Sequence, residues 1–211
     1  MYFRDRTEAG QVLAQKLQSY KDRSDVLVLG LPRGGVPVAY EVARELRAPM
    51  DVFIVRKLGV PGHKELAMGA IATGGIRILH NAVIREMGIS AEVIELVTST
   101  QLKELERREQ LYRGDRAGPL ISGRVVIVVD DGLATGSTMK AAIAALRQQR
   151  PERIVVAVPT APAETVAELK TIADEVVCPL MPEPFYAVGG SYADFRQITD
   201  EEVRDLLRRA A

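Results

Sequence analysis

Short runs of consecutive apolar residues alternate along this chain with longer stretches in which apolar residues recur every three or four positions. The short runs occupy residues 26–29, 52–55, 125–129, 154–158 and 176–177. Continuous apolar runs of this length indicate strands covered on both faces, as in a parallel sheet with helices packed on either side. The pattern therefore predicts an α/β fold, and its extent along the chain predicts a single domain over residues 1–211.

Helical spacing of apolar residues separates these runs and also marks both ends of the chain. Asp5 and Glu8 have the spacing of a capping box, and apolar residues then continue at helical spacing to Tyr20. Thr199 and Glu202 repeat the capping spacing before a last helix. Two further helices are predicted at residues 36–46 and 137–146. Helices thus lie between strands, as the crossovers of a parallel sheet require.

Two regions depart from this alternation. Residues 57–75 contain too many glycines for a plain helix, whereas residues 90–113 have the spacing of one long helix, within a helical insertion at about 82–116. We expect the long helix to form a packing or dimer surface, so a homodimer is one candidate assembly. The final segment, from about residue 179 to 211, combines prolines with a cluster of aromatic residues and is expected to form a variable structure of its own.

Composition narrows the classes of function. Twenty-eight basic residues balance 28 acidic residues, so the formal net charge is zero, which argues against a dedicated binder of nucleic acid or of membrane surfaces. The single cysteine, Cys178, excludes an internal disulfide framework, and the presence of only two histidines, His63 and His80, argues against a His-rich metal centre. The start shows no signal peptide and no stretch has the length of a membrane span, so we expect a cytoplasmic protein.

The segment at residues 125–138 carries the most specific chemistry. A buried strand delivers two carboxylates, Asp130 and Asp131, and a glycine-containing turn then leads into a helix. The turn and the first helical residues supply three hydroxyls, at Thr135, Ser137 and Thr138. Hydroxyls and free N–H groups at a helix N-terminus suit a phosphate monoester, while carboxylates suit the hydroxyls of an attached sugar or a bound cation.

A Walker A loop is excluded because Gly136 stands where that loop requires lysine. The segment instead resembles the 5-phosphoribosyl 1-pyrophosphate (PRPP) binding motif of the type I phosphoribosyltransferases. Residues 30–35 resemble the pyrophosphate-binding loop of that family, and Arg56-Lys57 before a glycine-rich stretch resembles the start of its mobile catalytic loop. The resemblance covers about residues 5–160 and implies a parallel-sheet core with a variable hood over the acceptor.

The resemblance implies a role for each matched residue. Asp130 and Asp131 would hold the ribose hydroxyls, directly or through Mg²⁺, and stabilise positive charge on the ring. Arg33 and Gly34 would bind pyrophosphate, and Lys57 with Arg56 would neutralise the leaving charge. The 5′-phosphate would lie on the loop residues Ala134, Thr135, Gly136, Ser137 and Thr138. The alternatives are a plain turn at Arg33 and a solvated strand end at Arg56-Lys57.

The acceptor is less defined. Family members that act on 6-oxopurines carry an acid at the position of Ala134, so hypoxanthine, guanine and xanthine are disfavoured here. Phe185, Tyr186 and Tyr192 can stack on a planar acceptor or form a small core of their own. His63 and Glu65 lie in the glycine-rich stretch, and their roles stay open.

Two functions are consistent with these residues. One is a Mg²⁺-dependent phosphoribosyltransferase that uses PRPP and a small planar acceptor. The other is a regulatory protein of the same fold that senses PRPP or a nucleotide without significant turnover. The presence of Arg33, Lys57, Asp130 and Asp131 together favours the enzyme.

Overall fold

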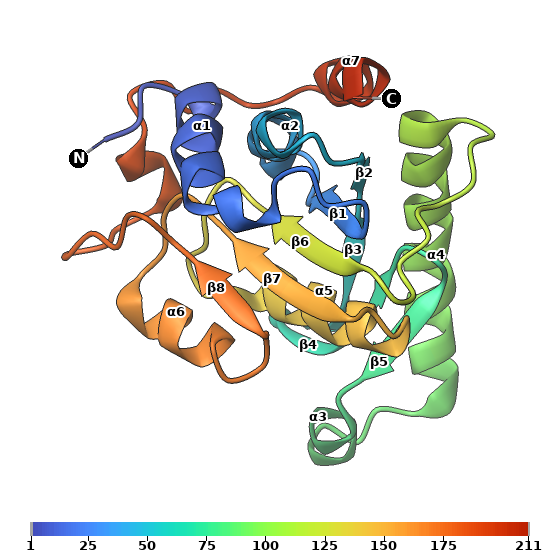
Figure 1. Cartoon of the computed structure of the whole chain (residues 1–211). Helices are drawn as coiled ribbons and strands as arrows, with labels where there is room; N and C mark the ends of the chain where they lie inside the picture. The colour runs from blue at the N-terminus through green and yellow to red at the C-terminus, as the bar shows by residue number, and fades with distance from the viewer. Residues whose placement is uncertain (1, 211) are drawn as a thin grey trace.

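The computed structural model describes residues 2–210, apart from the side chains of Lys64 and Glu65. Its centre is a five-stranded sheet in which every neighbouring pair of strands is parallel (Figure 1). The strands in spatial order are β2 (Met50–Val52), β1 (Val26–Gly30), β6 (Val125–Val129), β7 (Arg153–Ala157) and β8 (Glu175–Val177). The predicted α/β fold with a parallel sheet is confirmed.

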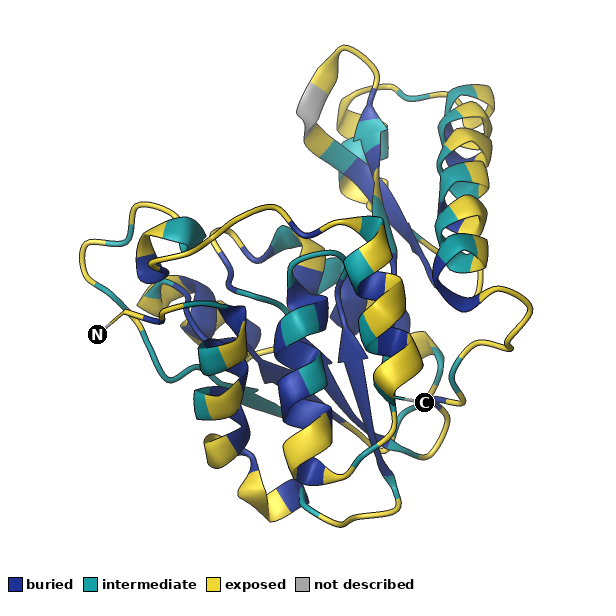
Figure 2. Ribbon diagram, turned by 90° about the horizontal axis from the view of Figure 1, so that it is seen from above, coloured by how far each residue is buried: buried dark blue, intermediate teal, exposed yellow. Residues whose placement is uncertain are grey.

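Helices cover both faces of this sheet. Alternate residues of a strand point to opposite faces, so Val126 and Val128 pack in the core with α5 and α6, while Val125 and Ile127 pack with α1 and α2. The central strands are accordingly buried throughout, and the exposed residues lie on the outer sides of the helices (Figure 2). The helices are α1 (Arg6–Lys16), α2 (Gly35–Leu46), α5 (Ser137–Gln148) and α6 (Ala163–Leu169).

Both predicted helix caps are present, and the second is a full capping box, whereas at the first the Glu8 side chain accepts from the backbone N–H of Arg4. The Asp5 side chain accepts a hydrogen bond from the backbone N–H of Glu8 at the start of α1. Thr199 and Glu202 exchange side-chain and backbone hydrogen bonds at the start of α7 (Asp200–Ala210). Each cap satisfies N–H groups that the first helical turn leaves free. Short 3-10 helices follow α1 at η1 (Gln18–Tyr20) and interrupt the C-terminal segment at η2 (Val188–Ser191).

A second, three-stranded antiparallel sheet lies beside the main one, with the order β3-β4-β5. It consists of β3 (Val55–Val60), β4 (His63–Ala72) and β5 (Ile76–Leu79), and it is followed by α3 (Asn81–Glu86) and the long helix α4 (Ala91–Arg113). The long helix agrees with the prediction. No helix among the described residues combines the length and the apolar composition needed to cross a bilayer.

Two predictions for this region are wrong. The apolar run at residues 52–55 is not one strand, because β2 ends at Val52 and Val55 begins β3 of the second sheet. Phe53 and Ile54 are buried at the crossing, where Phe53 packs in the core of the main sheet and Ile54 in that of the second. The stretch after Lys57, expected as a loop, is a hairpin, because buried residues such as Leu58 pack it against α4.

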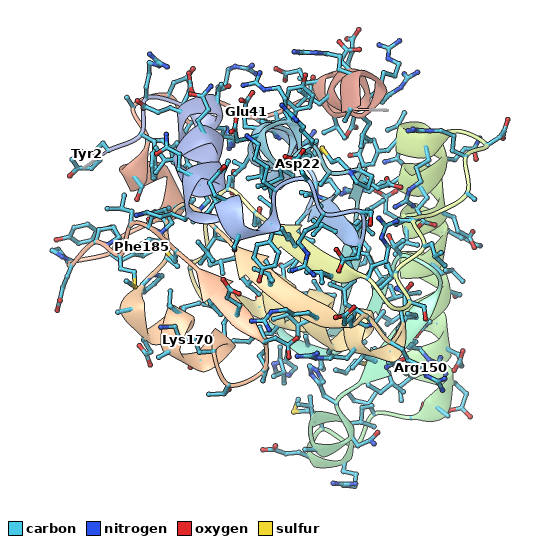
Figure 3. The ribbon with its side chains drawn as sticks, in the orientation of Figure 1. Tyr2, Asp22, Glu41, Arg150, Lys170 and Phe185 are labelled. Carbon is cyan, nitrogen blue, oxygen red and sulfur yellow. The ribbon has the colours of Figure 1, made fainter. Side chains whose placement is uncertain are left out.

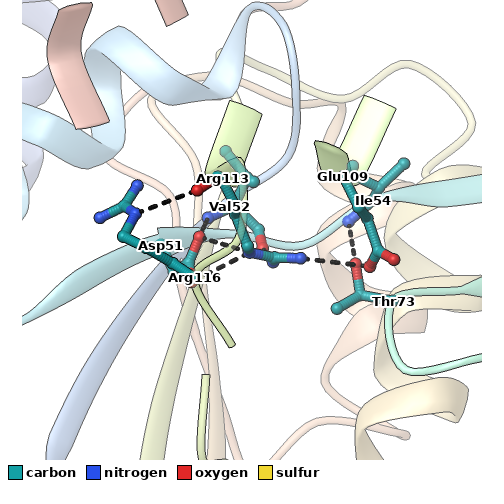
Figure 4. A network of polar contacts seen from close by, with 7 residues as sticks. All are labelled: Asp51, Val52, Ile54, Thr73, Glu109, Arg113 and Arg116. Atoms are coloured by element: carbon teal, nitrogen blue, oxygen red, sulfur yellow. Dashed lines mark hydrogen bonds and ion pairs between the residues drawn. The ribbon is translucent and has the colours of Figure 1, made fainter. Parts of the chain in front are cut away.

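A buried arginine joins the second sheet and α4 to the edge of the main sheet (Figure 4). The Arg113 side chain is 4% exposed, and its Nε donates to both carboxylate oxygens of Asp51, at 3.0 and 3.1 Å. It also pairs with Glu109 and donates to the carbonyl oxygen of Val52. Nearby, the backbone N–H of Ile54 donates to the Thr73 hydroxyl. The crossing between the sheets is therefore fixed by polar contacts as well as by packing.

Arg113→Ala should destabilise the protein by about 3–5 kcal/mol, because it leaves Asp51 and the Val52 carbonyl buried without their partner. The change in the free energy of unfolding can be measured by urea denaturation. Arg116→Ala is the matched control: Arg116 is exposed just beyond the end of α4 and donates one hydrogen bond of 3.3 Å to the carbonyl oxygen of Arg113, so its loss should change the stability by less than about 0.5 kcal/mol. Equal losses for the two variants would contradict the role assigned to Arg113.

Candidate functional site

Two adjacent carboxylates stand at the carboxyl end of the central strand β6. Asp130 and Asp131 are both half-buried, and Asp130 accepts a hydrogen bond of 2.9 Å from the backbone N–H of Asp131. Burial raises the pKa of Asp130 well above its ordinary value, and the negative charge of Asp131 raises it further. Burial also raises the pKa of Asp131. The pair is thus arranged for a ligand that brings hydroxyls or positive charge to it.

The loop after β1 lies directly against these acids. A Cβ atom placed on Gly34 would lie 2.0 Å from Oδ2 of Asp131, and one on Gly35 would lie 2.6 Å from the carbonyl oxygen of Val129. Only glycine allows the backbone to approach so closely. The loop contains a cis peptide bond between Pro32 and Arg33, and the half-buried Arg33 side chain has Nη1 4.0 Å from Oδ1 of Asp200 and lines a cavity together with Asp131. The structure therefore brings Arg33 and Gly34 together with the acid pair.

The loop that follows the acids opens at the N-terminus of α5. Gly136 adopts a φ of 66°, the left-handed conformation that glycine favours. Thr135 and Thr138 are exposed and Ser137 is half-buried, so their hydroxyls are accessible at the first turn of the helix. The Thr165 hydroxyl donates to the carbonyl oxygen of Ala134 at 2.6 Å and anchors the loop to α6. This geometry suits an anion held by helix N–H groups and hydroxyls.

Strand β3 places its two basic residues differently. Arg56 donates from Nε to the Gln101 side chain of α4 at 3.0 Å, and burial lowers its pKa. Lys57 is exposed. Both line a cavity of about 560 Å³ that is also lined by Thr138, at the N-terminus of α5. Lys57 is thus free to meet a ligand at that loop, whereas Arg56 is tied to the long helix.

Two arginines that the sequence motifs do not indicate also belong to this region. Arg6 and Arg196 line a cavity of about 370 Å³ together with Arg33, Gly34 and Asp131. Arg6 donates from Nε and Nη2 to Oδ2 of Asp131, each at 2.8 Å. The one sequence signal for Arg6 is its position, since a cation in the first turn of a helix is unfavourable to the helix dipole and needs another reason to be there.

The three aromatic candidates for acceptor binding separate in the structure. Tyr192 is buried, its hydroxyl donates to the carbonyl oxygen of Asp131, and its ring lies 5.0 Å from that of Phe195 and 5.6 Å from that of Phe3. It therefore holds the C-terminal segment against the acids and has no ring face free for stacking. Phe185 and Tyr186 instead line a cavity of about 320 Å³ near the chain start (Figure 3), and Tyr186 is 89% exposed.

The remaining candidates do not converge on the acids. His63 is exposed at the start of β4, and the Glu65 side chain lies outside the described residues. Cys178 is half-buried just after β8, donates to the carbonyl oxygen of Leu180, and has its pKa raised by burial to about 11. A thiol in that state is a packing residue.

The acid pair fits a divalent cation that shares its ligands with a substrate. Among the described residues, no three His, Cys, Asp or Glu side chains gather as a metal centre. Asp130 and Asp131 alone would leave most of an octahedral shell to other oxygens. Mg²⁺ is commonly bound in this way, by one or two carboxylates together with substrate phosphates and water. The donor set therefore suits Mg²⁺ brought with a diphosphate ligand.

Comparisons with known proteins agree with this geometry. The family model described as a phosphoribosyl transferase domain matches residues 6–193. A Mycobacterium tuberculosis protein provisionally named a phosphoribosyl transferase is 48% identical over 208 residues, which are 99% of this chain and 47% of that protein. The chain thus spans about half the length of the curated relatives it matches.

Two solved structures extend the comparison. The crystal structure of TT1426 from Thermus thermophilus is 44% identical, with a TM-score of 0.89 over 100% of both chains. A purine phosphoribosyltransferase from Pyrococcus horikoshii is 20% identical, with a TM-score of 0.50 over 92% of both chains, and shares the fold.

Asp130→Asn should stabilise the ligand-free protein near neutral pH. Because the pKa of Asp130 is raised in the folded state, this group contributes stability in full below its ordinary value of 3.8 and loses it as the pH rises through the raised value. At neutral pH the buried charge therefore opposes folding, and the neutral amide removes it. The melting temperature of the variant should exceed that of the wild type by a few degrees at neutral pH, and the two should converge near pH 4.

Thermal unfolding in EDTA across this pH range measures the effect. Asp115→Asn, which removes an exposed carboxylate, is the control and should follow the wild type at every pH. An Asp130→Asn variant that melts below the wild type at neutral pH would show that the charge is compensated in the folded protein.

Proposed function

This chain belongs to the phosphoribosyl transferase family, and we propose that it transfers the 5-phosphoribosyl group of PRPP to a nitrogen atom of a planar, nucleobase-like acceptor, releasing pyrophosphate. The observation that supports this best is the meeting of three features at the carboxyl edge of one sheet. These are the acid pair after β6, the loop with Gly34 and Gly35 that follows β1 and lies against the acids, and the hydroxyl-lined N-terminus of α5. Ligands bind at this edge in open α/β sheets.

Each feature suits one part of PRPP. The loop from Ala134 to Thr138 would hold the 5′-phosphate through hydroxyls and the N–H groups of α5. Asp130 and Asp131 would accept hydrogen bonds from the ribose hydroxyls. Arg33 and the exposed backbone of Gly34 would meet the pyrophosphate, because the cavity beside Asp131 is lined by both.

The reaction separates charge across the ribose. As the acceptor nitrogen attacks the anomeric carbon, the bond from that carbon to pyrophosphate breaks with its electron pair leaving on oxygen. Positive charge grows on the ring, where the carboxylates of Asp130 and Asp131 stabilise it. Negative charge grows on pyrophosphate, where Arg33 and Lys57 neutralise it. The Asp131 carboxylate is already held by Arg6 and needs little reorganisation to stabilise the ring.

Magnesium, held by Asp130 and Asp131 with oxygens of PRPP, would supply further neutralisation of the diphosphate.

The acceptor would lie beyond the acid pair, on the side of the C-terminal segment. At position 134 a methyl group offers no hydrogen bond to a ring nitrogen, which disfavours 6-oxopurines. The cavity lined by Phe185 and Tyr186 offers an aromatic surface instead, with Glu183 at its rim as a polar group. A planar acceptor with an exocyclic amine fits these groups, because a carboxylate can accept its N–H.

Thr135→Ala with Ser137→Ala should weaken the binding of ribose 5-phosphate and of PRPP, each by on the order of tenfold or more, because both ligands lose hydrogen bonds to the charged 5′-phosphate. Binding of pyrophosphate alone should be unchanged. Isothermal titration calorimetry in Mg²⁺ measures all three ligands. Thr171→Ala is the matched control, since that exposed hydroxyl only bonds within its own helix end. A selective loss of pyrophosphate binding would reverse the assignment of the two loops.

Pyrophosphate release from PRPP with a panel of bases tests the function as a whole. Hypoxanthine and guanine should be poor acceptors, by about a hundredfold or more relative to adenine, a pyrimidine or another planar amine, because position 134 lacks the acid that would pair with them. The measurement is steady-state release at saturating PRPP and Mg²⁺. Tight PRPP binding without release for any base would instead support a sensing protein, and efficient conversion of guanine would contradict the role given to Ala134.

A further inference from the structure

The second acid of the pair is held by the two ends of the chain. The backbone of residues 3–4 pairs with that of residues 191–194: Phe3 N–H donates to Ser191, Ala193 N–H to Phe3 and Asp194 N–H to Arg4, at 2.8–2.9 Å. We call residues 3–6 and 191–196 the terminal clamp. The clamp touches Asp131 twice, through the Tyr192 hydroxyl on its carbonyl oxygen and through Arg6 on its carboxylate.

The Arg6 guanidinium is held in place by hydrogen bonds and by an aromatic ring. Nε and Nη2 both donate to Oδ2 of Asp131, and Nη1 donates to the carbonyl oxygen of Arg196 at 2.8 Å. The Phe195 ring lies beneath the guanidinium, with its centroid 4.1 Å from Cζ. The side chains of Arg6 and Asp131 are only 9% and 13% exposed. Several independent contacts thus define one orientation for the pair.

A buried ion pair of this kind adds little to the free energy of unfolding, but it fixes the orientation of both side chains. Desolvation of both ions largely offsets their attraction, so stability alone does not explain why a charged pair is buried here. Both Arg6 donors meet Oδ2, so neither occupies Oδ1, and the carboxyl group of Asp130 lies within hydrogen-bonding reach of the same side chain. The carboxylate then presents a defined lone-pair direction at the site where the ribose would lie.

We propose that Arg6 is a positioning residue for ribose recognition: it holds Oδ2 of Asp131 so that Oδ1 accepts a hydrogen bond from the ribose 2-hydroxyl. This inference rests on the proposed function. It makes the chain start and the C-terminal segment part of the sugar site, although neither contributes to the sequence motif. The function of the clamp is then to keep Arg6 between Asp131 and Phe195.

The test compares ribose 5-phosphate with 2-deoxyribose 5-phosphate, which needs no knowledge of the acceptor. A site built to bond a hydroxyl discriminates strongly against a ligand that lacks it. The wild type should bind the ribose compound tighter by on the order of tenfold or more. In Arg6→Gln this ratio should fall close to one, and Arg6→Lys, which keeps the charge but loses the planar donor pair, should retain an intermediate ratio.

Lys16→Gln is the matched control, because Lys16 is an exposed residue of the same helix that lies outside the terminal clamp, and this variant should keep the wild-type ratio. A change of fold alone would weaken both ligands together and leave the ratio unmoved, and Arg6→Lys keeps the test decisive if Arg6→Gln does not fold. A wild-type ratio in Arg6→Gln, or in Arg6→Lys, overturns this inference alone. Failure of the wild type to bind ribose 5-phosphate overturns the proposed function and this inference with it.

Discussion

The ends of β1 and β6 approach so closely that no side chain fits between the loops that follow them. Gly30 pairs with Val129 in the parallel register, and the next N–H, that of Leu31, donates to the Val129 carbonyl at 2.8 Å. From there the glycine loop has to pass over the acids, with Gly34 and Gly35 in contact with them. The loop that carries Arg33 and the two carboxylates are therefore held together by the register of the central sheet and not by contacts between their own charged groups.

The buried acids lie beside a cavity that is lined by positively charged side chains. The chain as a whole is neutral, yet the cavity beside Asp131 is lined by three arginines, Arg6, Arg33 and Arg196. Each of these arginines also has a carboxylate within 4.0 Å, so the cavity combines positive charge that favours an anionic ligand with acids that oppose a bare anion. A ligand that carries phosphates at its ends and hydroxyls between them satisfies both. The zero net charge argues against a dedicated polyanion binder but conceals this local pattern.

Local sequence was enough to predict the parts of the fold that depend on neighbouring residues. The strand, acids and loop at residues 125–138 are contiguous, and the helix caps at Asp5 and Thr199 involve residues three apart, so pattern alone located them. The run at residues 52–55 was misassigned because the crossing between two sheets buries Phe53 and Ile54 as a strand would. The contact of Arg6 with Asp131 joins residues 125 positions apart, and no local pattern encodes it.

In the proposed function, PRPP and the acceptor are bound by different kinds of structure. The residues that the proposed function assigns to PRPP follow β1 and β6 or lie in β3, whose positions are fixed by the two sheets, whereas those assigned to the acceptor lie on the C-terminal segment. Loops and tails of this kind can change without moving the strands that carry the donor site. Ala134 is the point where the two meet, since it belongs to the donor loop and its carbonyl is already held by Thr165. Because the Ala134 side chain offers no polar group, the proposed function assigns selection between bases to the C-terminal segment.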